Sequence, residues 1–448
     1  MKRFIKHIQQ PLPVMALACC LAFPGCDKYL EGTQLPAGTI EAGDVYINDN
    51  MASTVVTGMF LNLNTGGSFS GSGSSNLGYV LGLYADESRS TLNGNYTDII
   101  FKNAITHSNS VYWADYYQKL FVANAAIRGI NNSTGNLVFK NQWLGEAYFL
   151  RGLYHFYLVN LYGPVPIVLT PDYTINNKLS RSPVAEVYKQ IVSDLKLAQA
   201  LLPEGYANGY GAATNSRVRP NKGAATALLA RAYLYAGDWE NAEIQAGNVI
   251  GDNRYDTVAL SSVFLANSRE TIWAVAPRAP ARTYEYGFYN GGMPATINPP
   301  QGPNSFDVYA SANENLLNAF EPGDRRQTTW LRSITILASG SNPEKVMYFP
   351  AKYKSPANNE EYQGLGAIQP ASKTALLAAI AKERQTELFA EYGHRFFDLK
   401  RTGRIDEVMN TVAPGKPATW QSYMSNWPIP PNDILSNPNL TPNPGYPQ

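Results

Sequence analysis

The segment from residue 222 to residue 250 restricts the possible fold more than any other part of the chain. It holds two stretches in which apolar residues recur every three or four positions, and the turn Ala236-Gly237-Asp238-Trp239 separates them. This spacing predicts two amphipathic helices joined by a tight turn. One helical hairpin of this size cannot bury both apolar faces by itself, so further helix pairs must stack against it. We therefore predict an all-α fold.

Similar periodicity elsewhere in the chain predicts the helices that complete the stack. Small residues at the helix crossing and the Gly-Asp turn make residues 222–250 resemble a tetratricopeptide unit, so we expect a tetratricopeptide-like helical repeat scaffold. One of its helices is expected to open with Ser182 as the N-cap and Pro183 in the first helical position. The other predicted helices cover residues 45–64, 111–131, 141–161 and 373–392.

Three segments lack this periodicity and are predicted to be irregular. Residues 65–75 are rich in Gly and Ser, residues 277–303 in Pro, Gly, Asn and Tyr, and residues 414–448 in Pro and Asn. Long irregular segments in a helical protein are usually functional or disordered. We therefore expect long ligand-binding loops on the helical scaffold.

The start of the chain has the pattern of an export signal. Lys2, Arg3 and Lys6 precede a short apolar run, and the segment ends in Gly25-Cys26. This predicts a signal peptide over residues 1–25 with a lipobox-like end, so that Cys26 becomes the lipid attachment point. The alternative is an ordinary signal peptide that happens to contain cysteines. No later stretch reaches the roughly 18 apolar residues that a membrane span requires, so the lipid would be the anchor.

The composition favours a protein that handles uncharged polar ligands. Lys and Arg number 36 against 35 Asp and Glu, only 16% of residues are charged, and there are 29 tyrosines. A nearly neutral chain without a concentrated basic region argues against nucleic-acid binding. No cysteine follows Cys26, so neither a disulfide framework nor a cysteine-based zinc site is expected downstream.

Several segments, in order along the chain, resemble the RagB/SusD family of outer-membrane nutrient-binding lipoproteins. The turn Tyr162-Gly163-Pro164-Val165-Pro166 after a helix matches a family signature, and so does the ending that starts at Pro428-Ile429-Pro430. The resembling segments are the lipobox start at residues 26–30, residues 151–166, residues 222–239, residues 383–403 and residues 428–446.

The resemblance implies a function as well as a fold. A SusD-like protein would lie on the outer face of the cell outer membrane, anchored by lipid. It would bind oligosaccharide and deliver it to a SusC-like TonB-dependent transporter, without catalysis and without a cofactor. Three alternatives remain open: capture of peptides, for which Arg278 and Arg282 could serve, a glycan hydrolase, or a purely structural scaffold.

The resemblance also implies one SusD-like domain over residues 26–448. Residues 45–260 would form the helical scaffold, and residues 261–448 a C-terminal region with loops and a closing helix. The chain departs from the family between residues 363 and 372, where it is short by about one helical repeat unit, roughly 34 residues.

Paired carboxylates are the strongest catalytic candidates, but an ion-pair interpretation is favoured. Glu383, Glu387 and Glu391 lie at helical spacing, and Asp86-Glu87 are adjacent. The first group is expected to form ion pairs that hold a helix in place, and neighbouring residues such as the second pair point in different directions. His155 lies among aromatic residues and is expected to pack in the core. No metal-binding or nucleophile motif occurs.

Aromatic and amide side chains in the predicted loops are the candidates for ligand binding. Sugars combine apolar C–H faces with polar edges, so their sites combine exposed rings with hydrogen-bonding groups. The alternative is that these rings pack the loops against the scaffold. The main candidates are Tyr284, Tyr286, Phe288, Tyr289 and Asn290, and the secondary candidates are Tyr79, Asn93, Tyr96 and Trp330.

Overall fold

The computed structural model describes residues 44–64, 69–70, 75–110, 112–276, 283–353, 372–411, 416 and 420–446. The predicted signal peptide, Cys26, the two arginines at 278 and 282, and residues 363–371 lie outside the described residues. From Tyr46 onward the chain belongs to one compact unit. None of its described helices combines the length and the apolar character needed to cross a membrane.

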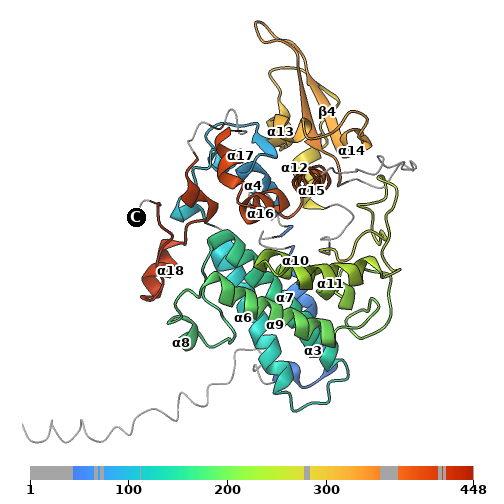
Figure 1. Ribbon diagram of the computed structural model, residues 1–448, viewed down its shortest axis with the longest axis vertical. Coiled ribbons are helices and arrows are strands. Elements are labelled where there is room, and N and C mark those ends of the chain that lie inside the picture. The colour runs from blue at the N-terminus through green and yellow to red at the C-terminus, as the bar shows by residue number, and fades with distance from the viewer. Residues whose placement is uncertain are drawn as a thin grey trace, which may run out of the picture. The chain divides into compact units, whose positions relative to one another are not determined.

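A stack of long helices forms the scaffold, as predicted. Consecutive helices pack against one another along the stack, from α6 through α7, α9 and α10 to α11, with α3 against α6 and α7. They lie together in the lower part of Figure 1. Their bounds are α3 Asp49–Leu61, α6 Tyr112–Asn131, α7 Lys140–Tyr162, α9 Val184–Leu201, α10 Lys222–Ala236 and α11 Trp239–Ile250, and the short α8 Tyr173–Asn176 joins α7 to α9.

The predicted hairpin of residues 222–250 is confirmed, and its caps explain where the chain turns. Asn221 caps α10 by accepting a hydrogen bond from the Ala224 N–H at 2.9 Å. Gly237 ends the helix with φ of 80°, in the left-handed region that glycine adopts without strain. Asp238 then caps α11 by accepting from the Asn241 N–H at 3.2 Å.

The start of α9 differs from the prediction. The helix begins at Val184, so Pro183 occupies the cap position and no side chain caps the helix. The Ser182 N–H instead donates to the Val165 carbonyl at 2.9 Å, in an isolated β-bridge. Ser182 is therefore used to tie the start of α9 to the turn that follows α7.

Helix α7 is the centre of the scaffold. Nearly all of its residues are buried, and Trp143 and Tyr154 are among the largest fully buried side chains. A buried ion pair between Arg151 and Asp194, at 2.6 Å, links it to α9. The helix is thus covered by neighbours on nearly every side, and the ion pair neutralises the charge of Arg151 inside the stack.

Shorter elements cover the scaffold and form its second layer. In Figure 1 the β4–β5 hairpin projects from this layer, beside α13 and α14. The helices are α4 Leu77–Tyr84, α5 Tyr96–Phe101, α12 Tyr284–Asn290, α13 Glu314–Leu317, α14 Arg325–Trp330, α15 Lys373–Glu387, α16 His394–Arg401, α17 Ile405–Thr411 and α18 Pro431–Ser436, with 3-10 turns at His107–Asn109, Pro303–Phe306 and Ser422–Ser425. A further 3-10 turn, Asp44–Tyr46, precedes α3, and its Tyr46 lies against Gly129 of α6.

Two small sheets occur in this layer, and periodicity did not predict them. Strands β1 Ser88–Ser90 and β3 Ala310–Ala312 pair antiparallel, with Ser88 opposite Ala312. Strand β4 Leu331–Ile336 pairs antiparallel with β5 Lys345–Pro350 and parallel with the two-residue β2 Thr296–Ile297. Ile297, Ile334 and Phe349 of this sheet form a small apolar cluster with Met293 and Val308. β1, β2 and β3 are too short to show an alternating pattern, and the six residues of β4 and of β5 do not alternate strictly between apolar and polar.

Helix α15 ends earlier than predicted, at Glu387. Ala390 and Tyr392 have φ of 60° and 40°, and Gly393 follows with 73°, so the chain turns sharply before α16. A Cβ atom on Gly393 would lie 2.2 Å from the Leu81 side chain, which shows how closely this turn approaches α4. The turn separates Glu391 from the helical face that it was predicted to share.

The ion-pair interpretation of the three glutamates is confirmed. Glu383 and Glu387 both accept hydrogen bonds from Arg326, at 2.7 and 3.0 Å. Glu391 instead pairs with the buried Lys352 at 2.6 Å. These pairs hold α14, β5 and the end of α15 together.

Candidate functional site

Three of the aromatic candidates belong to the core, which corrects the expectation that they are exposed on loops. Tyr79 is only 4% exposed, and Tyr289 and Trp330 are fully buried. The Trp330 indole N–H donates to the Leu260 carbonyl at 3.1 Å, and the ring packs edge-on against Phe264. Buried rings at these positions hold the second layer together and offer no surface to a ligand.

The aromatic candidates Tyr284, Tyr286 and Phe288 lie on helix α12, not on an irregular loop. Helix α12 is capped by Thr283, which accepts from the Tyr286 N–H at 3.4 Å. Its Glu285 points inward and accepts from Ser70 at 2.9 Å and from Asn76 at 2.7 Å. This buried carboxylate, whose pKa is raised by burial, fixes which face of α12 turns outward.

The outward face of α12 carries stacked rings. Tyr284 and Phe288 are half-buried, with ring centroids 6.4 Å apart and planes within 11° of parallel. Tyr286 is also half-buried, while the side chain of Asn290 lies outside what the structure describes. The Phe288 ring lies with its centroid 5.5 Å from that of Tyr79, so the buried tyrosine supports the half-buried pair.

The segment that carries Asn93 and Tyr96 forms a second edge of the site. Asn93 is exposed, and Gly94 takes φ of 78°. The Gly94 N–H donates to Asp98 at 2.7 Å, and Lys102 donates to the same carboxylate oxygen at 2.6 Å. Burial opposes ionisation of Asp98, but these hydrogen bonds overcome it and lower the pKa of that carboxyl. Tyr96 is half-buried, and burial raises its pKa to about 12.

Hydrogen bonds after β1 bring these two edges together with a third. Thr91 donates from its N–H to the Tyr309 carbonyl at 2.9 Å and from its hydroxyl to the Val308 carbonyl at 3.1 Å. Gly291, at the end of α12, lies so close to this segment that a Cβ atom there would be 2.2 Å from the Phe306 carbonyl oxygen. Thr91 and the end of α12 at Gly291 thus both approach residues 306–309, and we call residues 91–96, 284–288 and 304–309 the loop surface.

Tyr309 is a member of the loop surface that sequence reasoning missed. Its hydroxyl donates to Asp307 at 2.9 Å, and the ring is partly exposed. Asp307 is exposed and has φ of 58°, at the end of the 3-10 turn in which Asn304 and Ser305 are also exposed. A single tyrosine in a polar stretch has no periodicity that distinguishes it, so only the pairing of β3 with β1 reveals its place.

Acid–base catalysis has no support among the carboxylates considered. Asp86 is fully buried and accepts two hydrogen bonds from Arg395. Burial, and then the charge of Asp86, raise the pKa of Glu87 to about 8. His155 is a core residue, as predicted, and burial lowers its pKa to about 4. Within the described part of the chain, no group of three His, Cys, Asp or Glu side chains is placed to hold a metal ion.

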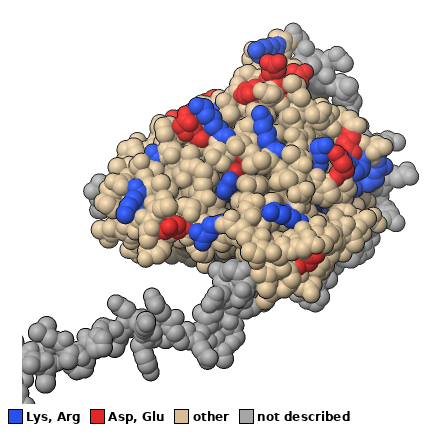
Figure 2. Space-filling view, turned by 90° about the horizontal axis from the view of Figure 1, so that it is seen from below, with Lys and Arg blue, Asp and Glu red and all other residues tan. Residues whose placement is uncertain are grey.

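Two cavities lie on the helical scaffold, away from the loop surface. One, of about 290 Å³, is lined by residues of α3, α6 and α7. The other, of about 710 Å³, lies between α3 and residues 207–219. Figure 2 shows one face of the molecule, on which charged side chains are scattered and form no continuous basic patch.

Two family models match the chain. One, described as "Starch-binding associating with outer membrane", matches residues 77–234, and the other, described as "SusD family", matches residues 350–446. Together they span more than half of the chain and include most of the scaffold, the Asn93 edge of the loop surface and the C-terminal helices. The two matched ranges contain most of the segments that resemble the family in the sequence, in the same order along the chain.

Individual proteins match in the same way. A SusD-like protein P2 of Formosa agariphila is 34% identical over 152 residues, which are 33% of this chain and 28% of that protein. The chain thus matches less than a third of the length of this curated relative. A laminarin-binding SusD-like protein has a similar structure, with a TM-score of 0.64 at 20% identity over 89% of this chain and 99% of that one. Surface glycan-binding protein A of Bacteroides fluxus also has a similar structure. Its TM-score is 0.67 at 19% identity, and the match covers 89% of this chain and 99% of that one.

Proposed function

This chain belongs to the SusD family, and we propose that it binds oligosaccharide or polysaccharide at its loop surface. Delivery to a SusC-like TonB-dependent outer-membrane transporter is the second part of the proposal. The observation that carries the binding proposal is the meeting of stacked half-buried rings with exposed amide and carboxylate groups on one surface. The neighbours named as binding laminarin and glycan support the same ligand class.

The chemistry of the loop surface suits a sugar. Tyr284, Phe288 and Tyr309 offer flat apolar faces against which C–H groups of a pyranose can pack. Asn93 and Asp307 are exposed on the same loop surface. The Asn93 amide can donate and accept hydrogen bonds, and the Asp307 carboxylate can accept them from sugar hydroxyls. Because the aromatic rings rest on buried neighbours such as Tyr79, the surface is ordered before a ligand arrives, which lowers the entropic cost of binding.

The same geometry supports binding without catalysis. Asp86 is engaged in a buried ion pair with Arg395, and Glu383 contacts Arg326 at the end of α15. Glu87 is only 2% exposed, so a ligand on the surface does not reach it. A hydrolase needs two carboxylates facing a common substrate. The exposed Asp307 accepts from the Tyr309 hydroxyl, and the other carboxylate within the described residues of the loop surface, Glu285, points inward to Ser70 and Asn76.

The cellular part of the proposal rests on the chain start and the family. Acylation of Cys26 after removal of residues 1–25 would tether the protein to the outer membrane, facing outward. The functional unit would then be residues 26–448, with residues 45–260 as the scaffold and residues 261–448 as the C-terminal region. Capture near the membrane would raise the local ligand concentration at the transporter.

Calorimetry with purified chain tests the binding proposal. The panel contains starch and laminarin oligosaccharides and, as the competing class, peptides of similar length. We expect at least one glycan to bind, and Tyr309→Ala and Asn93→Ala each to weaken that binding by about tenfold, the effect of losing one good contact. Tyr173→Ala, which removes an exposed tyrosine on α8, should change the affinity by less than about twofold.

Two results would contradict this proposal. Binding of peptides without any glycan would identify the chain as a peptide-capturing protein. New reducing ends after incubation with the glycans would identify a hydrolase. The transport step is tested in cells, where deletion of this chain with the transporter retained should abolish or strongly reduce uptake of the glycan that binds.

A further inference from the structure

The larger cavity of the scaffold is separate from the loop surface and has the size of a ligand site. It occupies about 710 Å³, within the range of roughly 300 to 1,000 Å³ that small-molecule sites have. Helix α3 forms one wall, and residues 207–219 form the other. We call it the α3 cavity. It shares no lining residue with the loop surface.

The second wall of the α3 cavity is held in one conformation by hydrogen bonds. The side-chain oxygen of Asn208 accepts from the N–H groups of Tyr210 at 2.9 Å and Ala212 at 3.1 Å. The Gly209 carbonyl accepts from Ser53 at 3.0 Å and from the Trp143 indole at 2.9 Å. A wall that is fixed on both α3 and α7 does not have to be ordered by a ligand.

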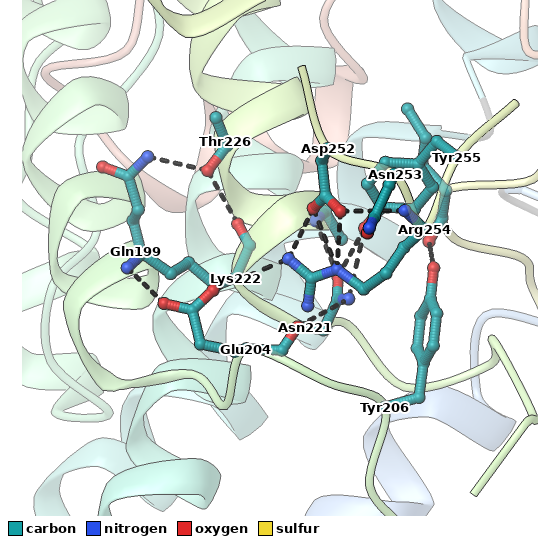
Figure 3. Close-up of polar contacts among 12 residues, drawn as sticks. Gln199, Glu204, Tyr206, Asn221, Lys222, Thr226, Asp252, Asn253, Arg254 and Tyr255 are labelled. Carbon is teal, nitrogen blue, oxygen red and sulfur yellow. Dashed lines mark hydrogen bonds and ion pairs between the residues drawn. The ribbon is translucent and has the colours of Figure 1, made fainter. Parts of the chain in front are cut away.

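The segment that carries this wall is also anchored where it begins. Figure 3 shows Glu204 beside Lys222 and Arg254, and the Lys222 pair measures 2.6 Å. Asn221 donates to the Glu204 carbonyl at 3.2 Å, which ties the start of the segment to its end. The cavity wall is therefore a closed loop with a fixed base.

Uncharged hydroxyl groups supply most of the polar chemistry of the cavity. Thr57 accepts a hydrogen bond from Arg219 at 2.9 Å, so its own hydrogen can be donated to a ligand. Thr54 donates to the Asn50 carbonyl at 2.7 Å, so its lone pairs can accept. Ser53, which donates to Gly209, can likewise accept. The site thus offers both donors and acceptors, as a polyhydroxylated ligand requires.

The cavity carries no net charge. Among the described residues that line it, Arg219 is the only charged one, and two hydrogen bonds of 2.9 and 2.6 Å join it to the buried Glu146. An anionic or cationic ligand would therefore meet no free counter-charge, and its desolvation would be unfavourable. Tyr210, which is 46% exposed, offers a ring face to an apolar C–H surface.

We propose that the α3 cavity is a second binding site, specific for short neutral saccharides. The hydroxyl-rich helix face would bind the polar edge of the sugar, and Tyr210 would cover its apolar face. The inference rests on the cavity itself and holds whether or not the loop surface binds glycan. A second site would let the protein retain a short saccharide on the scaffold while a longer chain occupies the loop surface.

Glycine substitutions test the site with little risk to folding. Gly58 lines the cavity on α3, and a Cβ atom there would meet nothing within 4 Å. Gly58→Phe should therefore fill the cavity without a clash in the backbone. Gly247 on α11 is equally open and lies outside the cavity, so Gly247→Phe is the matched control.

Calorimetry or saturation-transfer NMR on the full chain uses maltose and cellobiose as neutral probes and N-acetylneuraminic acid as a charged one. We expect at least one neutral disaccharide to bind. Gly58→Phe should weaken the affinity for this disaccharide about tenfold or more, and Gly247→Phe should change that affinity less than about twofold. Tyr210→Ala should also weaken it, whereas Tyr173→Ala should not. Circular dichroism of each variant confirms that it is folded.

The comparison with Tyr309→Ala separates this proposal from the one for the loop surface. If the α3 cavity binds the disaccharide, Tyr309→Ala leaves that binding intact. If Tyr309→Ala loses disaccharide binding while Gly58→Phe still binds the disaccharide normally, the proposal of a second site is overturned. So does failure of both neutral disaccharides to bind the unmodified chain, or equal binding of the charged probe.

Discussion

Arg395 donates two hydrogen bonds to the carboxylate of Asp86, at 2.8 and 2.7 Å, and so joins positions that are 309 residues apart. The Asp86 side chain is fully buried and that of Arg395 is 12% exposed. The pair links the segment after α4 to α16. It therefore fixes the N-terminal part of the second layer, which carries one edge of the loop surface, against the C-terminal helices.

Removing Asp86 is expected to destabilise the protein strongly. Asp86→Ala leaves the guanidinium of Arg395 buried without its partner, which costs about 3 to 5 kcal/mol of unfolding free energy. The exposed pair of Glu186 and Lys189 provides the control, and Glu186→Gln should cost less than about 1 kcal/mol. Urea unfolding followed by circular dichroism measures both, and equal losses for the two variants would contradict a structural role for the buried pair.

Glu87 is expected to make stability depend on pH. Burial raises its pKa from 4.5 to about 8, so between these values the folded state binds more protons than the unfolded state. The stabilisation is therefore complete below pH 4.5 and is lost as the pH rises through about 8. Glu87→Gln mimics the neutral acid, so relative to this variant the unmodified chain should lose unfolding free energy between pH 5 and pH 8.

Urea unfolding at several pH values between 5 and 8 measures the difference in unfolding free energy between the unmodified chain and Glu87→Gln. The Glu186→Gln variant serves as the exposed control and should follow the curve of the unmodified chain. If the difference in unfolding free energy between the unmodified chain and Glu87→Gln stays constant across this range, the pKa of Glu87 is not raised by its burial.

Two Tyr→Phe substitutions should act in opposite directions. The hydroxyl of Tyr289 is buried and has no hydrogen-bond partner among the described residues. Its removal should leave stability unchanged or raise it, by up to about 1 to 3 kcal/mol. The Tyr188 hydroxyl donates to Asn160 at 3.1 Å, so Tyr188→Phe should cost about 1 kcal/mol. Thermal unfolding compares the two variants, and a larger loss in Tyr289→Phe would be inconsistent with the packing described.

Asp98 is expected to act on binding through the conformation of its neighbours. Its carboxylate holds Gly94, which has φ of 78° beside the exposed Asn93. In Asp98→Ala this edge of the loop surface loses its fixed geometry, and affinity for the glycan identified in the panel should fall by about tenfold. Asp172→Ala, which removes a similar backbone contact at the start of α8, is the control and should bind normally. Unchanged affinity in Asp98→Ala would exclude this edge from the site.

The scaffold was readable from sequence because its signals are local. Apolar spacing and the Gly237-Asp238 turn act between residues three or four positions apart, so α6, α7, α10 and α11 were predicted to within a few residues. The family resemblance followed from the same local segments. The all-α class, the helix pairs and the core position of His155 thus needed no knowledge of distant contacts.

Exposure of individual side chains depended on the tertiary structure alone. Tyr289 and Tyr284 lie on the same short helix, yet one is buried and the other half-exposed, because inward-pointing Glu285 sets the rotation of α12 against Ser70 and Asn76. Tyr309 joined the site only because β3 pairs with β1. Such contacts join residues about 200 positions apart or more, and no pattern within a segment encodes which partner will cover a given ring. Local sequence therefore determined the helices, and long-range packing decided which of their side chains a ligand can reach.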